Sequence, residues 1–296
     1  MMLMQMAVWL TVKTGPFRGK WRLLRWIAER PYELELLPPR IVEVDGGSHL
    51  LVEAFNNRAH YVEPQSLRKD AGVVQVFRSV LRDGDVVVDV GANIGRMTVL
   101  GSRLVGKTGK VFAFEPSPKV ISSLYRNIAY NRCSNVTVFN SAVSDECGEI
   151  TFFMPVGTNS AWGSIRNIGV SSSILVTVAS TSLDSRSEIT EPVRLLKIDV
   201  EGADLRVVRG ARKLIQKNRP VVTLEFSPTW IRDLGDDPQW LRTFASEEGY
   251  FLYEVTQAGL RPLQELPEQQ IDILCLPWRL NGGSWADLAR SAGELA

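Results

Sequence analysis

The sequence predicts an α/β fold in which helices cover both faces of a mostly parallel sheet. Short apolar runs alternate with helical periods from residue 86 onward, as is typical of strands buried on both faces. A glycine-containing turn, Asp89-Val90-Gly91-Ala92-Asn93-Ile94-Gly95, joins the first of these runs to a helix. The next apolar run ends in the acidic Glu115, about 20 residues after Gly95, a spacing typical of nucleotide-binding βαβ units.

Composition and charge limit the classes of protein to which the chain can belong. Its 296 residues are 45% hydrophobic and 23% charged, which is ordinary for a chain with a full core. The formal net charge of +1 favours no polyanionic partner, so we expect no nucleic-acid binding. The three cysteines form no C-x-x-C pair, which argues against a disulfide framework and a zinc site. The apolar segment 1–10 is too short to span a bilayer and has no basic region before it, so we expect a soluble, cytoplasmic protein.

Residues 1–69 are interpreted as an N-terminal extension. The first thirty residues hold six basic residues and one acidic residue, and Trp21, Leu24 and Ile27 recur among them at helical spacing. This pattern predicts a basic amphipathic helix that packs its apolar stripe on the main domain; weak contact with an anionic membrane surface is the alternative. Alternating residues over 41–55, interrupted by Asp45-Gly46-Gly47, predict a β-hairpin.

The main domain is expected to begin with a helix over 70–81 and then to alternate strands and helices. The last two strands have no helix between them and should pair antiparallel. In chain order, the pattern predicts strand 86–90, helix 95–104, strand 111–115, helix 118–131, strand 136–140, strand 195–199, helix 204–217, strand 221–226, helix 238–248, and strands 250–255 and 271–276.

A β-insertion is expected to interrupt this alternation. Two alternating stretches, 149–154 and 173–178, flank a loop over 157–172 that is rich in glycine, asparagine and serine. Trp162 lies in this loop, and we expect it to cover a bound substrate; an exposed loop tip or a core anchor are the alternatives. The tail over 278–296 is expected to be a short helix or frayed.

The turn from Gly91 to Gly95, called the glycine loop below, predicts a nucleoside site. A glycine at 91 lets the backbone approach a ligand closely, and the following helix presents unpaired N–H groups. A dinucleotide fingerprint would need glycines in place of Asn93 and Arg96, and the lysine of a P-loop is missing. The loop therefore fits an uncharged nucleoside, and Asp89 could meet an ammonium group on the ligand.

Two further strand ends complete the predicted nucleoside site. Glu115 can accept hydrogen bonds from vicinal ribose hydroxyls, and it could also cap the helix that begins near Ser117. Ser141 and Ala142 follow the third strand, where an adenine edge would lie, although Ser141 could equally cap a turn.

Three carboxylates are the candidates for chemistry. Asp199 and Glu201 end the fourth strand, and strand alternation should point both side chains the same way. Glu225 ends the fifth strand and is expected to line the substrate side of the same cleft. A general base or substrate positioning is the first interpretation; Mg²⁺ held by the carboxylates and capping of the following helix are the alternatives. His49 and His60 lie far before the loop, so a histidine base is not expected.

Four blocks of the sequence resemble, in order and spacing, the signature of the FkbM family of methyltransferases. The resemblance runs from about Asp70 to Leu276, so residues 70–277 are interpreted as a methyltransferase domain. It implies a Rossmann-like, seven-stranded class I methyltransferase sheet with an antiparallel last strand, and S-adenosylmethionine as the donor. The family often has glutamate where Asp70 and Asp204 stand, which shortens the reach of both carboxylates. The blocks are Asp89 to Gly95, Phe114-Glu115-Pro116, Ala142-Val143-Ser144-Asp145 and Lys197-Ile198-Asp199-Val200-Glu201-Gly202.

We therefore expect an O-methyltransferase that acts on a hydroxyl of a sugar, glycolipid or natural-product small molecule. The transfer to oxygen is implied by the resemblance. A non-catalytic domain that keeps the fold as an interaction module and a nicotinamide-dependent oxidoreductase are the alternatives. The expected site residues are Asp199 and Glu201 for catalysis, Asp70, Asp89, Gly91, Asn93, Gly95, Glu115, Ser141 and Ala142 for the donor, and Trp162 and Glu225 for the acceptor.

Overall fold

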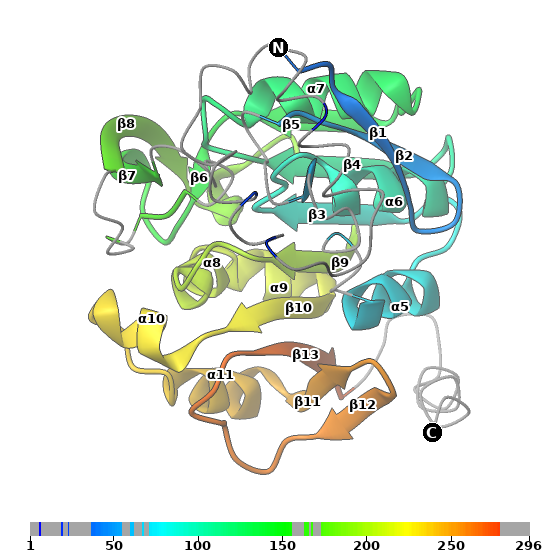
Figure 1. Ribbon diagram of the computed structural model, residues 1–296. Coiled ribbons are helices and arrows are strands. Elements are labelled where there is room, and N and C mark those ends of the chain that lie inside the picture. Colours follow the sequence, from blue (N-terminus) through cyan, green and yellow to red (C-terminus); the bar gives the residue numbers. More distant parts are fainter. Residues whose placement is uncertain are drawn as a thin grey trace.

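A computed structural model describes residues 6, 19, 23, 37–54, 60–61, 67, 71–155, 163–165, 167 and 173–278 (Figure 1). Most of the predicted N-terminal helix, Asp70, Trp162 and the tail after Trp278 lie outside these residues. None of the helices within the described residues is long and apolar enough to cross a membrane.

The core of the fold is a sheet of eight strands in the order β12-β11-β13-β10-β9-β3-β4-β5. Strands β5, β4, β3, β9 and β10 are parallel, and β13 runs antiparallel between β10 and β11. The bounds are β3 Val86–Val90, β4 Lys110–Phe114, β5 Val136–Phe139, β9 Val193–Ile198, β10 Val221–Phe226, β11 Tyr250–Thr256, β12 Gly259–Pro262 and β13 Ile271–Pro277. The expected α/β sheet with an antiparallel last strand is confirmed.

The eighth strand is the one difference from the expected seven. β12 is a short edge strand that pairs antiparallel with β11 across a tight turn. Its sequence, Gly259-Leu260-Arg261-Pro262, contains only one large apolar residue. The glycine and the proline are typical of a turn, so the sequence pattern did not predict a strand here.

Alternation within the central strands explains why the sheet is covered on both faces. All five residues of β3 are buried. Val86, Val88 and Val90 belong to one hydrophobic cluster, whereas Val87 belongs to another on the opposite face. Apolar residues at every position of a strand therefore mark burial between two layers of helices.

The helices differ from prediction at two places. The predicted helix 204–217 is two short helices that break at Ala211, where the backbone leaves the helical region (φ −112°, ψ 8°). A further short helix, α10, begins at Pro228 after β10. The helices are α5 Ala71–Val80, α6 Arg96–Leu104, α7 Ile121–Tyr130, α8 Asp204–Gly210, α9 Arg212–Asn218, α10 Pro228–Asp233 and α11 Trp240–Glu248.

The predicted hairpin is present and packs on α6 and α7 (Figure 1). Its strands are β1 Arg40–Val44 and β2 Ser48–Val52. Asn131 on α7 accepts a hydrogen bond from the N–H of His49 (3.0 Å) and donates one to its carbonyl (2.6 Å). Asn127, one turn earlier, pairs in the same way with Leu51. The side-chain amides of Asn127 and Asn131 thus make the backbone hydrogen bonds to β2 that a neighbouring strand would otherwise make.

The β-insertion also matches its prediction and forms a separate sheet with the strand order β6-β8-β7. The strands are β6 Ala142–Val143, β7 Gly148–Pro155 and β8 Ser173–Thr181. Beyond β7, Ser164 pairs with Phe153 through two backbone hydrogen bonds of 2.8 and 3.1 Å. This pairing carries residues 163–165 back over the end of the central sheet.

Candidate active site

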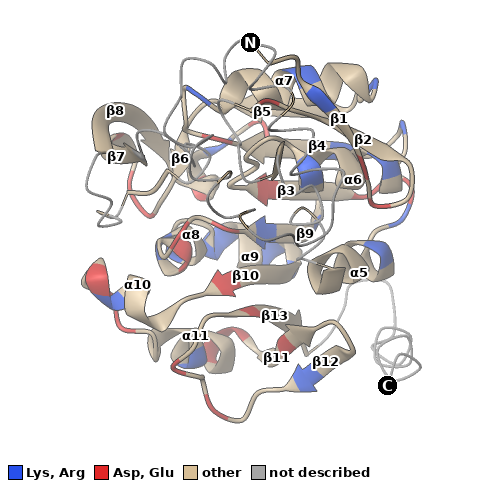
Figure 2. Cartoon of the chain, in the orientation of Figure 1, with Lys and Arg blue, Asp and Glu red and all other residues tan. Residues whose placement is uncertain are grey.

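The carboxyl ends of β3, β4, β9 and β10 meet at one edge of the sheet, where two cavities lie side by side. The first cavity, of about 60 Å³, is lined by Glu115, Ala142 and residues of the insertion. The second, of about 130 Å³, extends towards β10 and β13. Both are lined by Gly91, Asn93 and Asp199, so the glycine loop separates two parts of one site. Figure 2 shows acidic residues at the ends of β3 and β10 and a basic residue on β9 between them.

Position 91 requires a glycine because the backbone there lies very close to the end of β9. Its φ is +76°, and a Cβ there would lie 1.9 Å from the carbonyl oxygen of Asp199. The prediction assigned this glycine to close approach of a ligand. In the structure the glycine loop is instead pressed against the end of β9, and the ligand-facing cavities open on either side of that contact.

The N–H groups of the glycine loop are already bonded within the protein. Gly91 and Ala92 both donate to the carbonyl of Phe114, at 3.0 and 2.9 Å. Asn93 donates to Glu115, and its own side chain accepts from the N–H of Ile94 at 2.7 Å. The loop thus uses these N–H groups to hold its own shape, and the unpaired N–H groups predicted at the start of the following helix stay a prediction.

Glu115 links the glycine loop to the start of the next helical segment. Its Oε2 accepts from the N–H of Asn93 and its Oε1 from the N–H of Ser117, both at 2.8 Å. Helix α7 begins at Ile121 and has no side-chain cap, so Glu115 bonds the segment before the helix and does not cap it. Each of its oxygens keeps a second lone pair for a ligand. Burial raises the pKa of Glu115 to about 7 in spite of these two bonds. Its role at a ribose stays a prediction.

Asp89 lies behind the glycine loop and lines neither cavity. It is fully buried, accepts a hydrogen bond from Thr98 Oγ1 at 2.6 Å and forms an ion pair with Lys197 at 3.2 Å. The ammonium group that Asp89 meets in the structure is thus that of a lysine within the protein. Sequence reasoning missed Lys197, which is 108 positions further along the chain.

Ser141 and Ala142, the two residues predicted at an adenine edge, have different surroundings. Ala142 lines the first cavity together with Phe152 and Gly163 of the insertion. Ser141 is 4% exposed, and its Oγ has no hydrogen-bond partner among the described residues. A buried hydroxyl without a partner costs free energy, so a polar ligand edge at this position would stabilise it.

Three carboxylates, Asp199, Glu201 and Glu225, form an acidic cluster whose oxygens lie within 4.8 Å of one another. The prediction that they converge is supported, but its reason is wrong. β9 ends at Ile198, so Asp199 and Glu201 belong to a turn and not to a strand. Glu201 adopts a left-handed conformation (φ +56°), and this turn brings the two side chains together.

Within the acidic cluster, the surroundings of Glu225 favour its protonated form. Burial, together with the charges of Asp199, Glu201 and Asp204, raises the pKa of Glu225 far above its ordinary value. Burial and Asp199 likewise raise the pKa of Asp204 to about 8. Asp204, the first residue of α8, also accepts from the N–H of Gly202 at 3.1 Å, but α8 has no side-chain cap, so the capping role considered for the cluster is not present.

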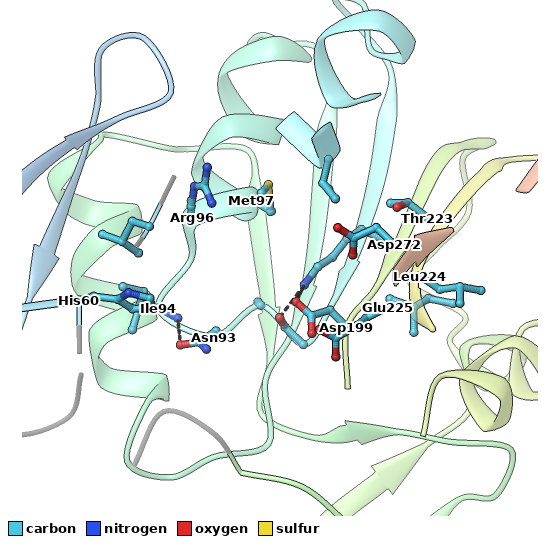
Figure 3. Close-up of a pocket in the computed structure, with 16 residues that line it drawn as sticks. His60, Asn93, Ile94, Arg96, Met97, Asp199, Thr223, Leu224, Glu225 and Asp272 are labelled. Atoms are coloured by element: carbon cyan, nitrogen blue, oxygen red, sulfur yellow. Dashed lines mark hydrogen bonds and ion pairs between the residues drawn. The ribbon is translucent and has the colours of Figure 1, made fainter. Parts of the chain in front are cut away.

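The second cavity contains residues that sequence reasoning did not assign to a site. Figure 3 shows Asp272 and Thr223 beside Glu225 and Asp199, with His60 on the opposite side. His60 was set aside because of its distance along the chain. In the structure His60 lines the same cavity as Asn93 and Ile94, and no periodicity in the sequence signals this contact.

Comparison with known proteins identifies the class of this site. The profile of the methyltransferase FkbM domain matches residues 89–252, from the end of β3 into β11. A hexuronic acid methyltransferase, AglP of Haloferax volcanii, is 27% identical over 197 residues, which cover 66% of this chain and 77% of that protein. The 31-O-demethyl-FK506 methyltransferase FkbM of Streptomyces tacrolimicus is 34% identical over 159 residues, covering 44% and 60%.

A crystal structure of methyltransferase FkbM from Methylobacillus flagellatus is also similar, with 17% identity and a TM-score of 0.44 over 67% of this chain and 47% of that one. The profile match spans more than half of the 296 residues and includes the glycine loop, Glu115 and the acidic cluster. The chain therefore belongs to the FkbM family of S-adenosylmethionine-dependent methyltransferases.

Proposed function

We propose that this enzyme methylates a hydroxyl group of a sugar or natural-product small molecule, with S-adenosylmethionine as the donor. The observation that carries the proposal is the acidic cluster at the junction of two cavities, one of which has the groups expected around a nucleoside. The two relatives act, by name, on a hexuronic acid and on 31-O-demethyl-FK506. Both names support an acceptor that carries hydroxyl groups.

The first cavity fits the nucleoside end of the donor. Glu115 has lone pairs available for vicinal hydroxyls, and Ala142 and Phe152 offer an apolar wall to a base. The buried hydroxyl of Ser141 lacks a partner that an adenine edge would supply. When bound, the sulfonium supplies an electrophilic methyl group, and its positive charge suits a junction lined by carboxylates.

Asp199 is the group that we assign as general base. Its side chain is 47% exposed and lines both cavities, so it can reach an acceptor beside the donor. As the acceptor oxygen forms its bond to the methyl carbon and the carbon–sulfur bond breaks, the hydroxyl proton passes to Asp199. The neutral form of Glu225 can donate a hydrogen bond that orients the same acceptor, and Glu201 completes the cluster.

Mg²⁺ remains an alternative use of the cluster, because three carboxylate oxygens at this spacing could serve as ligands. A metal would lower the pKa of the acceptor hydroxyl in place of a base. The predicted donor role of Asp70 and the predicted acceptor role of Trp162 stay proposals of the same kind, and so does membrane contact by the N-terminal helix.

The test is transfer of a labelled methyl group from S-adenosylmethionine to panels of sugars, glycolipids and hydroxylated metabolites, with added Mg²⁺ or with a chelator. We expect a methyl ether as product and activity that survives chelation. Activity lost with chelator and restored by Mg²⁺ would assign the cluster to a metal. Donor bound without transfer to any hydroxylated acceptor, but with transfer to an amine, would overturn the proposed chemistry.

A further inference from the structure

The ammonium group of Lys197 joins the glycine loop, β3 and the acidic cluster. Its Nζ lies 2.8 Å from the carbonyl oxygen of Gly91 and 3.3 Å from that of Val90. It also lies 3.2 Å from Asp89 Oδ1 and 3.5 Å from Asp199 Oδ2. An ammonium has three protons, so these acceptors account for all of its donor capacity.

Asp89, the buried partner of Lys197, is held in place within the core. Thr98, on α6, and Asp89 are both fully buried, and the 2.6 Å hydrogen bond between them orients the carboxylate. The side chain of Lys197 is 8% exposed, whereas that of Asp199 is 47% exposed. A chain of polar contacts therefore runs from the interior of the sheet outward to the carboxylate that lines both cavities.

The charge on Lys197 is permanent under working conditions. Burial alone would favour the neutral amine, but the carboxylates of Asp89 and Asp199 outweigh it and raise the pKa of Lys197 above its ordinary value. The lysine is therefore no proton acceptor, and it is a fixed positive charge beside Asp199. Glu225 differs, because its Oε1 accepts from the uncharged amide of Gln270 at 2.5 Å.

Asp199 and Glu225, two of the three acids of the cluster, thus have different partners. The ammonium group next to Asp199 restricts the rotamers of its carboxylate, whereas burial beside other carboxylates favours the protonated form of Glu225. Lys197 also bonds the glycine loop, so the position of Asp199 is tied to the loop that separates the two cavities.

We infer that Lys197 is a positioning residue that acts through Asp199: anchored by Asp89 and Thr98, it holds the Asp199 carboxylate in a fixed place beside the two cavities. This inference rests on the proposed role of Asp199 as the base. It differs from a structural role because its effect on the rate must disappear when Asp199 can no longer act.

A mutant cycle on the full-length enzyme tests this coupling. Lys197→Met alone would leave Asp89 buried without its partner, so the first arm combines Asp89→Asn with Lys197→Met, which removes both charges and keeps the shape. We expect this pair to lower kcat by about 10- to 100-fold, because a misplaced base loses much of its contribution. The Kd of S-adenosylmethionine should change by less than about threefold, since neither Asp89 nor Lys197 lines the first cavity.

The second arm is Asp199→Asn, alone and added to the pair. We expect Asp199→Asn alone to lower kcat by about 100-fold or more, and the triple variant to be no slower than Asp199→Asn. Losses that multiply would overturn the inference, and so would a pair variant with unchanged kcat. If Asp199→Asn keeps the full rate with donor bound, Asp199 is not the base and the proposed function is wrong at that point. Because Asp199→Asn is also measured alone, this result can be told apart from a missing coupling between Lys197 and Asp199.

Thr98→Val supplies a second route should the pair variant fold poorly, because it changes only one buried hydroxyl at the anchored end of the chain. We expect a loss of kcat of about 3- to 10-fold that again vanishes in the Asp199→Asn background. Lys110→Met is the matched control, because Lys110 is a half-exposed lysine on β4 that pairs with Glu191 at the surface. Its kcat should equal that of the wild type in both backgrounds.

Discussion

Glu115 shows how one side chain serves both the fold and the ligand site. Its two oxygens hold the N–H groups of Asn93 and Ser117, and burial brings its pKa to about 7. A carboxyl group with this pKa passes from mostly protonated to mostly ionised as the pH rises through neutrality. The charge available to a ribose therefore depends on pH.

Glu115→Gln should weaken binding of S-adenosylmethionine by about 10- to 100-fold at pH 8.5, because hydrogen bonds to a charged group contribute more than those to a neutral one. At pH 5.5 the wild-type carboxyl is protonated, so the difference between the two proteins should shrink. Isothermal titration at both pH values measures it. Glu191→Gln, at an exposed ion pair, is the control, and equal affinities for Glu115→Gln and wild type at pH 8.5 would contradict the assignment.

Gly91 makes a second prediction at this scale. Gly91→Ala should lower the free energy of unfolding by at least about 2 kcal/mol, since it combines a left-handed backbone with a Cβ placed on the Asp199 carbonyl. Gly235→Ala separates the two causes, because Gly235 has a similar φ of +81° and no atom within 4 Å of its Cβ position. The control should lose only about 1 kcal/mol in denaturant unfolding. Equal losses would mean that the close approach to β9 is not what requires glycine.

Whether a site residue could be predicted depends on how far along the sequence its partners lie. Gly91 and Glu115 lie within one βαβ unit, where spacing alone relates them. Lys197 meets Gly91 across 106 residues of chain, and only the parallel pairing of β3 with β9 brings them together. The convergence of Asp199 and Glu201 was predicted from strand alternation, whereas a left-handed turn residue produces it.

The hairpin is the element whose position the sequence concealed. Its strands were predictable from alternation and from the Asp45-Gly46-Gly47 turn, but its docking was not. Arg96, on the helix that follows the glycine loop, holds Asp45 through two hydrogen bonds of 2.9 and 3.0 Å, with both side chains nearly buried. Ile94 of the glycine loop packs in the same hydrophobic cluster as the hairpin. The hairpin therefore braces the loop from the side opposite β9.

Asn131→Ala should loosen this brace without unfolding the sheet. The N–H and carbonyl of His49 would lose their partner, and we expect the amides of β2 to exchange with solvent about 5- to 30-fold faster, equivalent to about 1–2 kcal/mol. Amides of β3 should keep their wild-type rates in hydrogen-exchange mass spectrometry. Asn218→Ala is the control, because Asn218 bonds only the carbonyl of Leu214 in its own helix. Unchanged exchange in β2 would show that the helical amides do not hold the strand.

At the scale of the whole molecule, the strand order follows from chemistry that a sequence carries well. Apolar runs without alternation require two covering layers, and the absence of a helix between β11 and β13 requires their antiparallel pairing. The edge strand β12 was not predicted, because a strand at the edge of a sheet needs few apolar residues. What the sequence does not carry is the concentration of carboxylates that assembly produces at the carboxyl ends of β9 and β10.

That concentration predicts how stability depends on pH. Folding raises the pKa of Glu115 from 4.5 to about 7 and that of Asp204 from 3.8 to about 8, and it raises that of Glu225 as well. Between their unfolded and folded pKa values these groups bind more protons in the folded protein. Their contribution to stability is therefore largest below about pH 4.5 and is lost progressively as the pH rises towards 8. We expect the donor-free enzyme to unfold at a higher temperature at pH 6 than at pH 8.5.

Glu225→Gln isolates the largest part of this effect, since glutamine keeps the shape and the hydrogen bond capacity but cannot ionise. The variant should be more stable than the wild type at pH 8.5, and its difference in Tm between pH 6 and pH 8.5 should be smaller. Glu268→Gln is the matched control: Glu268 pairs with Arg232 at the surface, and that partner lowers the pKa of Glu268, so its contribution has the opposite sign and is already complete by pH 6. A Glu225→Gln profile parallel to the wild type in thermal unfolding would show that the acidic cluster ionises without cost to the fold.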